Sequence, residues 1–186
     1  MTVVEEIKDD MKDPMLLTLE DIREHCRLLE RSVVSKETRF IVRVLRSLPA
    51  TRKKLSNDVL KKLVRGYFTH SNEARDSLAK YLYRDGETDM DDGQLGIKFR
   101  SNKLASTPLL PEIDCYLHLL VFLRLMDEKK LVEAEACSEE LMAKISTHNR
   151  RSMDHIAARS YYHYAQCHEA KGQLSTIRGF LHGKLR

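Results

Sequence analysis

A chain of 186 residues with 42% hydrophobic residues can bury a core, although this apolar fraction lies slightly below the usual range for a compact domain. The net charge of +4 is uneven: residues 1–21 carry −5, residues 22–84 carry +10, and the remainder carries −1. The N-terminus has no apolar run of signal-peptide length, and no later run is long enough to span a bilayer. We therefore expect a soluble protein of the cytosol or nucleus.

Four cysteines are scattered along the chain without a C-x-x-C pair, each beside apolar positions of an expected helix. Such spacing favours buried free thiols over disulfides or a zinc site. The four residues are Cys26, Cys115, Cys137 and Cys167.

The first half of the chain predicts a flexible acidic lead-in over residues 1–17, followed by basic helical hairpins over residues 18–84. Apolar residues recur there at spacings of three and four, which is typical of amphipathic helices. Thr18, Ser35 and Ser56 are the expected N-caps of the first three helices. A fourth helix is expected over residues 72–83.

Proline and glycine mark the expected breaks. Pro49 is expected to end the second helix, because proline cannot donate to the helical ladder. Residues 85–111 combine an acidic, glycine-rich loop with the linker sequence STPLLPE. Calcium binding by this loop is not favoured, because counting from Asp85 or from Glu87 places Met90 or Asp92 at the sixth position, where an EF-hand needs glycine.

The pattern of residues 112–186 predicts two repeats of a helical hairpin, with helices over 112–126, 131–145, 152–171 and from 174 onward. Leu131 and Leu174 start equivalent helices 43 residues apart. The helix over 112–126 is apolar on nearly all sides, so we expect it to be the inner helix of the array. The pattern predicts an all-α fold, a right-handed α-solenoid of TPR-like helical hairpins with about eight helices.

No motif in the sequence predicts catalysis or a cofactor. There is neither a phosphate-binding glycine loop nor a nucleophile elbow. His155 and His163 could share a helix face, and Cys115 and His118 lie one turn apart, but ordinary core or surface positions are favoured over metal ligation. The aromatic cluster at residues 161–164 is likewise favoured as packing over base stacking. We expect no enzymatic activity, no metal and no cofactor.

Basic residues are the candidate interaction sites. The basic segment over residues 22–84 could meet a partner protein, nucleic acid or only water, and nucleic acid is the less favoured partner. The turn over residues 147–151 could cap the preceding helix or form a protein-contact edge, and the sequence favours neither. The candidates are Arg39, Arg43, Arg46, Lys53, Lys54, Lys61, Lys62, Arg65, Arg150 and Arg151.

Five segments resemble the N-terminal part of the 26S proteasome non-ATPase regulatory subunit 3 family. They occur in the same order and near the same spacing between Leu19 and Arg186. The segments are KETRF at 36–40, the helix end at 45–48 with Pro49, STPLLPE at 106–112, ISTHNRR at 145–151 and FLHGKLR at 180–186.

This resemblance implies a non-catalytic scaffold in the lid of the regulatory particle, found in cytoplasm and nucleus, that supports degradation of ubiquitylated proteins. It implies that helical repeats lead into a PCI domain, and that the partners are other PCI-containing lid subunits and a small acidic disordered subunit. Because this chain stops at Arg186, we expect a fragment, a truncated product or a partial gene model. The alternatives are a scaffold of a related PCI complex (signalosome or translation-initiation complex) and an RNA-binding helical protein.

Overall fold

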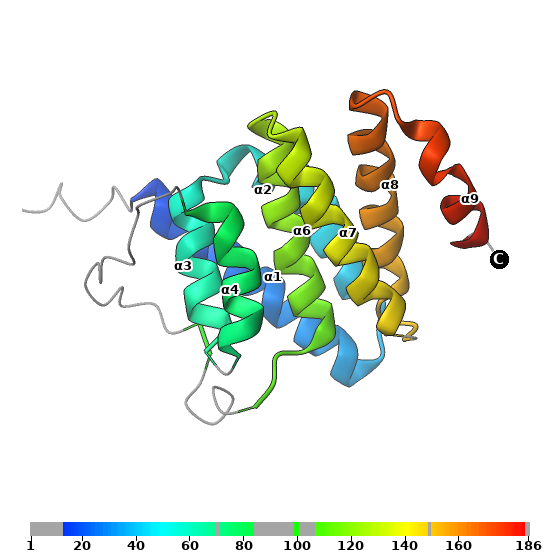
Figure 1. Ribbon diagram of the computed structural model, residues 1–186. Coiled ribbons are helices and arrows are strands. Elements are labelled where there is room, and N and C mark those ends of the chain that lie inside the picture. Colours follow the sequence, from blue (N-terminus) through cyan, green and yellow to red (C-terminus); the bar gives the residue numbers. More distant parts are fainter. Residues whose placement is uncertain (1–12, 70, 84–98, 101–106, 149, 185–186) are drawn as a thin grey trace, which may run out of the picture.

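The computed structural model describes residues 13–69, 71–83, 99–100, 107–148 and 150–184. These residues form eight α-helices and contain no strand (Figure 1), as the hydrophobic periodicity predicts. The helices are α1 (Pro14–Ser35), α2 (Arg39–Lys54), α3 (Asn57–Tyr67), α4 (Asn72–Leu82), α6 (Pro111–Asp127), α7 (Leu131–Thr147), α8 (Asp154–Ala170) and α9 (Leu174–Lys184).

Consecutive helices pack as the pairs α1–α2, α3–α4, α6–α7 and α8–α9, and α6 holds the pairs together (Figure 1). It contacts α1, α2, α3, α4, α7 and α8. Every residue from Cys115 to Leu123 is at most 1% exposed. The prediction that this helix is the inner one is therefore confirmed, and its near-uniform apolarity follows from having neighbours on all sides.

Helix α1 starts earlier than the sequence predicts. Pro14 takes the first helical position, where its missing N–H costs nothing, and the Asp13 side chain accepts a hydrogen bond of 3.0 Å from the Met15 backbone N–H. Thr18 is not the N-cap, because its hydroxyl donates back to the Pro14 carbonyl at 2.8 Å. Residues 14–17, expected in the flexible lead-in, are thus helical, whereas residues 1–12 lie outside the described part of the chain.

Two expectations for α2 are also wrong. Ser35 is the last residue of α1 and donates to the Arg31 carbonyl at 2.8 Å, so it caps nothing. Pro49 lies inside α2, which continues to Lys54. The apolar side chains on both sides of Pro49, Leu48 and Leu55, are 2% and 4% exposed, and this burial outweighs the hydrogen bond that the proline cannot donate.

The N-cap of α3 and the extent of α4 follow the sequence closely. The Ser56 hydroxyl accepts a hydrogen bond from the Val59 backbone N–H at 3.3 Å, which confirms the predicted N-cap. Helix α4 covers all but the last residue of the predicted range. The acidic loop and most of the linker, residues 84–98 and 101–106, lie outside the described residues. The expected loop therefore stays a prediction, and so does the division of the chain into two helical parts on either side of it.

The repeat in the second half is visible in the helix starts. Helices α7 and α9 begin at Leu131 and Leu174, as the 43-residue spacing predicts. The equivalent residues Ala134 and Ile177 are both buried, at 0% and 5% exposure. The next equivalent pair, Cys137 and Phe180, differs in burial. Cys137 is 0% exposed, whereas Phe180 is 37% exposed on a helix that packs mainly on α8. No helix among the described residues is long and apolar enough to cross a bilayer.

Candidate protein-interaction surface

Four of the ten predicted basic residues form a row on the outer face of α2. Arg39, Arg43, Arg46 and Lys53 are all exposed, opposite the buried residues of that helix. Arg39 is already engaged locally, with its Nε 2.8 Å from the Glu37 carboxylate. Within the part of the chain that the structure describes, Arg43, Arg46 and Lys53 have no ion pair.

The remaining helical candidates are less available. The Lys54 ammonium group donates to the Asp21 carboxylate of α1 at 2.9 Å, so it joins two helices of the same chain. Lys61 and Lys62 of α3 are half-buried, and the Lys61 ammonium lies 4.8 Å from the centre of the Tyr83 ring. Arg65 is exposed on the same helix. The ten residues therefore come from three segments rather than one element.

The basic turn between α7 and α8 is tied to a buried carboxylate. Glu112, in the first turn of α6, is 0% exposed and its Oε1 accepts a hydrogen bond of 2.5 Å from the Ser152 hydroxyl. The Arg150 guanidinium lies 3.7 Å from the same oxygen. Arg150 thus serves inside the chain, whereas Arg151 is exposed and has no ion pair among the described residues.

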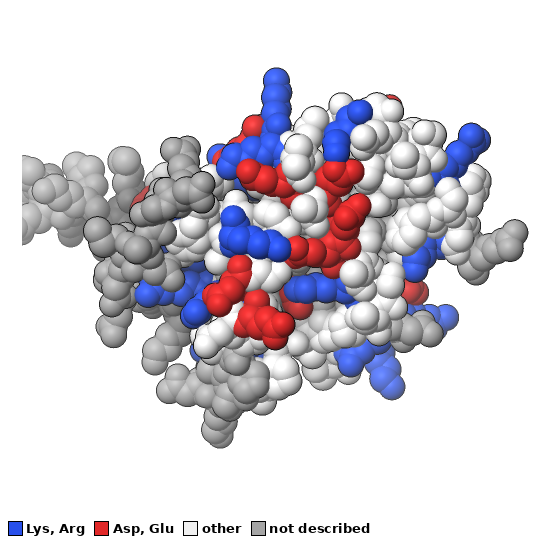
Figure 2. All heavy atoms as spheres, viewed as in Figure 1, with Lys and Arg blue, Asp and Glu red and all other residues white. Residues whose placement is uncertain are grey.

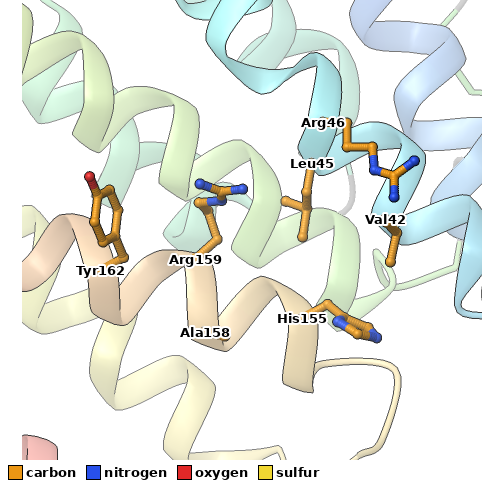
Figure 3. A pocket seen from close by; sticks show the side chains of 7 residues that line it. All are labelled: Val42, Leu45, Arg46, His155, Ala158, Arg159 and Tyr162. Atoms are coloured by element: carbon orange, nitrogen blue, oxygen red, sulfur yellow. The ribbon is translucent and has the colours of Figure 1, made fainter.

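A groove lies between α2 and α8 and consists of two adjoining pockets. The first has a volume of about 450 Å³ (Figure 3) and the second of about 680 Å³. Both are lined by Arg159 and Tyr162 of α8, which join them into one trough. On the α2 side the first pocket is lined by Val42, Leu45 and Arg46, and the second by Leu48, Pro49, Arg52 and Lys53.

The groove has an excess of positive charge. Arg52 donates to both Asp127 carboxylate oxygens, at 2.7 and 2.9 Å, so this pair is neutral. No anion among the described residues pairs with Arg46, Lys53 or Arg159. Burial lowers the pKa of His163, and the nearby cations Arg52 and Arg159 lower it further. The cations Arg46, Lys53 and Arg159, unpaired among the described residues, would attract an anionic ligand.

Acidic and basic side chains pair with each other on another face of the molecule. On the face over α4 and α7, acidic and basic side chains are interspersed, with acidic groups gathered along α7 (Figure 2). Glu140 of α7 accepts hydrogen bonds from Ser77, Lys80 and Tyr81 of α4 at 2.9, 2.5 and 2.9 Å. The charged groups of this face therefore pair with each other and join two helices. The α2–α8 groove, whose cations are largely unpaired among the described residues, is the stronger candidate surface.

Sequence reasoning missed the α8 side of this groove. His155, Arg159 and Tyr162 recur at spacings of four and three, which places them on one stripe of the helix. Tyr162 is 54% exposed, whereas Tyr164 is buried, as the packing interpretation of the aromatic cluster predicts. The stripe was readable from the sequence, but its facing helix α2 lies more than a hundred residues earlier in the chain.

The described residues offer no arrangement suited to nucleophilic catalysis. All four cysteines are buried, and burial raises the pKa of the Cys26 and Cys115 thiols to about 12, so both are protonated and unreactive. His25 lies between the Ser47 hydroxyl at 2.9 Å and the Tyr116 hydroxyl at 2.8 Å, but the Ser47 hydroxyl donates to the Val44 carbonyl. Among these residues no group of three potential metal ligands converges.

Comparison with known proteins places this helical array in a family. The model of the family described as PSMD3-like, N-terminal TPR repeats, matches residues 14–186. The chain belongs to that family. The repeats of the PSMD3-like family are the helical hairpins of Figure 1, so the solenoid prediction is confirmed.

Relatives from distant organisms cover the chain from end to end. It is 40% identical over 186 residues to the "Probable 26S proteasome non-ATPase regulatory subunit 3" of Anopheles gambiae, covering 100% of this chain and 36% of that protein. It is 32% identical over 190 residues to the 26S proteasome non-ATPase regulatory subunit 3 of Dictyostelium discoideum, covering 99% of this chain and 38% of the relative. The chain thus spans a little over a third of these relatives' length.

Proposed function

We propose that this chain is a non-catalytic scaffold element of the proteasome regulatory-particle lid, which supports ubiquitin-dependent degradation through protein–protein contacts in the cytoplasm and nucleus. The observation that carries the proposal is the family match over residues 14–186, together with relatives named as proteasome regulatory subunits. The fold supports it, because stacked helical hairpins present extended surfaces to partners.

The proposed partners are other PCI-containing lid subunits and a small acidic disordered subunit. The exposed row on α2, Arg39, Arg43, Arg46 and Lys53, is the part of the surface that best suits an acidic partner, because charge complementarity raises association rates and selects partners. Arg151 and the α3 residues Lys62 and Arg65 are secondary candidates. Lys54, Lys61 and Arg150 already contact groups of this chain, so we expect their contribution to a partner to be smaller.

Affinity purification of the tagged chain from eukaryotic cells, with mass spectrometry of the co-purifying proteins, tests this proposal. We expect lid subunits to be recovered, and the double variant Arg39→Glu with Arg43→Glu to recover at least fivefold less of them. Arg178→Glu on the exposed face of α9 is the matched control and should recover the wild-type amount.

Two results would contradict the scaffold assignment. One is the recovery of signalosome or translation-initiation subunits, or of RNA, in place of lid subunits. The other is the absence of lid subunits even when the chain is extended to the full length of its relatives.

A further inference from the structure

The first pocket of the α2–α8 groove is lined by one arginine from each of its two walls. The residues that line the groove increase in number along α2 and along α8 in the same direction, from Val42 and His155 at one end to Lys53 and Gln166 at the other. Arg46 and Arg159 both line the first pocket, and Figure 3 shows their guanidinium groups on the two sides of Leu45.

The described residues that line this pocket carry positive charge only. They include Arg46, Arg159 and the histidine His155, and none of them is acidic. Neither arginine has an ion pair with any residue that the structure describes, unlike Arg52, which Asp127 neutralises in the second pocket. A planar guanidinium binds phosphate through two parallel hydrogen bonds. A carboxylate carries one negative charge and would leave the second guanidinium uncompensated, whereas a phosphate monoester carries nearly two.

The rest of the lining favours a peptide as the carrier of the phosphate. Val42, Leu45 and Ala158 give the pocket apolar walls, which suit the side chains that flank a phosphorylated residue. A bilayer is flat and cannot enter a trough between two helices. A nucleic acid requires a continuous basic track for its regularly spaced phosphates, whereas the groove is interrupted by the neutral Arg52–Asp127 pair.

We propose that the α2–α8 groove binds a phosphoserine or phosphothreonine peptide of a partner protein, with the phosphate bound by the side chains of Arg46 and Arg159. Tyr162, which is 54% exposed and lines both pockets, covers the peptide next to the phosphate. The second pocket, with Lys53 on its wall, selects an acidic side chain farther along the peptide. This inference goes beyond the proposed scaffold function and does not rest on it, because the chain alone contains the groove.

Binding of immobilised chain to peptide libraries tests the site. One library carries phosphoserine at a fixed central position with degenerate flanks, and two others carry serine or aspartate there. We expect retention of the phosphoserine library at least tenfold above the serine library. Fluorescence polarisation with a retained peptide should then show Arg46→Gln and Arg159→Gln each weakening binding at least fivefold. Arg43→Gln, which removes an exposed arginine of the same helix outside the groove, should change the Kd less than twofold.

Three outcomes would overturn the proposal: equal retention of the phosphoserine and serine libraries, equal retention of the phosphoserine and aspartate libraries, or binding unaffected by Arg46→Gln and Arg159→Gln. The second would mean that the groove accepts acidic peptides without requiring phosphate. Circular dichroism of each variant checks that the helices are intact. Because these measurements use the chain and peptides alone, failure here leaves the lid assignment untouched, and failure to recover lid subunits leaves this site untouched.

Discussion

Gly66 of α3 has no side chain, and this leaves room for the ring of Phe99 to pack against the helix. A Cβ built at Gly66 would overlap the ring of Phe99, which packs 5.4 Å from the Tyr67 ring, centre to centre. Next to it, the Arg100 guanidinium donates to the backbone carbonyls of Tyr67 at 3.5 Å and of Thr107 at 2.9 Å. Residues 99–100 are thereby attached to the end of α3, between the two halves of the chain.

Gly66→Ala should lower the free energy of unfolding by about 1–3 kcal/mol, because the new methyl group overpacks a filled site and displaces Phe99. Gly179→Ala in α9 is the matched control. No atom of the described residues lies within 4 Å of a Cβ built there, so alanine should raise the stability by up to about 1 kcal/mol through its helix propensity. Chemical denaturation measures both. A Gly66→Ala variant that is stabilised like the control would show that Phe99 does not occupy this position.

Hydroxyl side chains show how far local sequence determines a cap. Ser56 caps α3 as predicted, but Thr18 and Ser35 donate to carbonyls four residues earlier, both at 2.8 Å. Serine and threonine can bond either to the next turn or to the preceding one. The sequence alone therefore located the α3 cap correctly and those of α1 and α2 incorrectly, because the choice depends on where the chain first becomes helical.

At the scale of an element, α2 contains its own weak point. Pro49 lies inside the helix and on its exposed side, where it removes a backbone hydrogen bond and its ring crowds the preceding turn. The buried face of α2 holds the helix together across this point. Because Pro49 also lines the second pocket, the break in the ladder lies at the wall of the groove.

Pro49→Ala should raise the free energy of unfolding by about 1–3 kcal/mol, because alanine restores the missing N–H donor and removes the clash. Pro14→Ala is the control, since Pro14 occupies the first position of α1, where its N–H would have no helical acceptor. We expect the control to change stability by less than about 0.5 kcal/mol. If both variants behave alike in chemical denaturation, the internal proline is not a source of strain in α2.

Helix α6 makes polar contacts that its apolar pattern could not reveal. Its His118 Nε2 lies 3.1 Å from the Cys137 carbonyl of α7, and its Arg124 pairs with Glu128 at 2.9 Å. The sequence indicates that α6 needs neighbours on every side. It does not indicate which neighbours, because a hydrophobic side chain can pack against any other of suitable size.

At the scale of the whole molecule, three histidines in different helices have lowered pKa values. Burial lowers the pKa of His25 and His163, and burial followed by the Lys144 cation lowers that of His118 from 6.5 to about 4. A group whose folded pKa lies below its unfolded value binds protons preferentially in the unfolded state within that interval. The stability that the neutral, buried His118 contributes is therefore fully present above pH 6.5 and is lost as the pH falls towards 4.

We expect the free energy of unfolding to decrease as the pH falls from about 6.5 to about 4, with His118 alone contributing about 3 kcal/mol. Denaturant titrations at half-unit pH steps measure this dependence. His118→Leu should reduce the slope in this interval, because no proton is then taken up at that position on unfolding. Burial raises the pKa values of Glu128 and Glu140, but Lys130 and Lys80 lower them overall. The stability that these carboxylates contribute is therefore lost mainly below pH 4.5. A slope unchanged in His118→Leu would contradict the assignment.

The sequence by itself determined the helical class, the inner position of α6, the starts of α7 and α9, and the family. These properties are local or periodic, since apolar residues at spacings of three and four identify a helix wherever its partners come from. Only the tertiary structure decided that Pro49 lies within a helix, that Arg150 reaches the buried Glu112, and that Arg46 and Arg159 line one groove. Each of these depends on segments that packing brings together, often from distant parts of the chain.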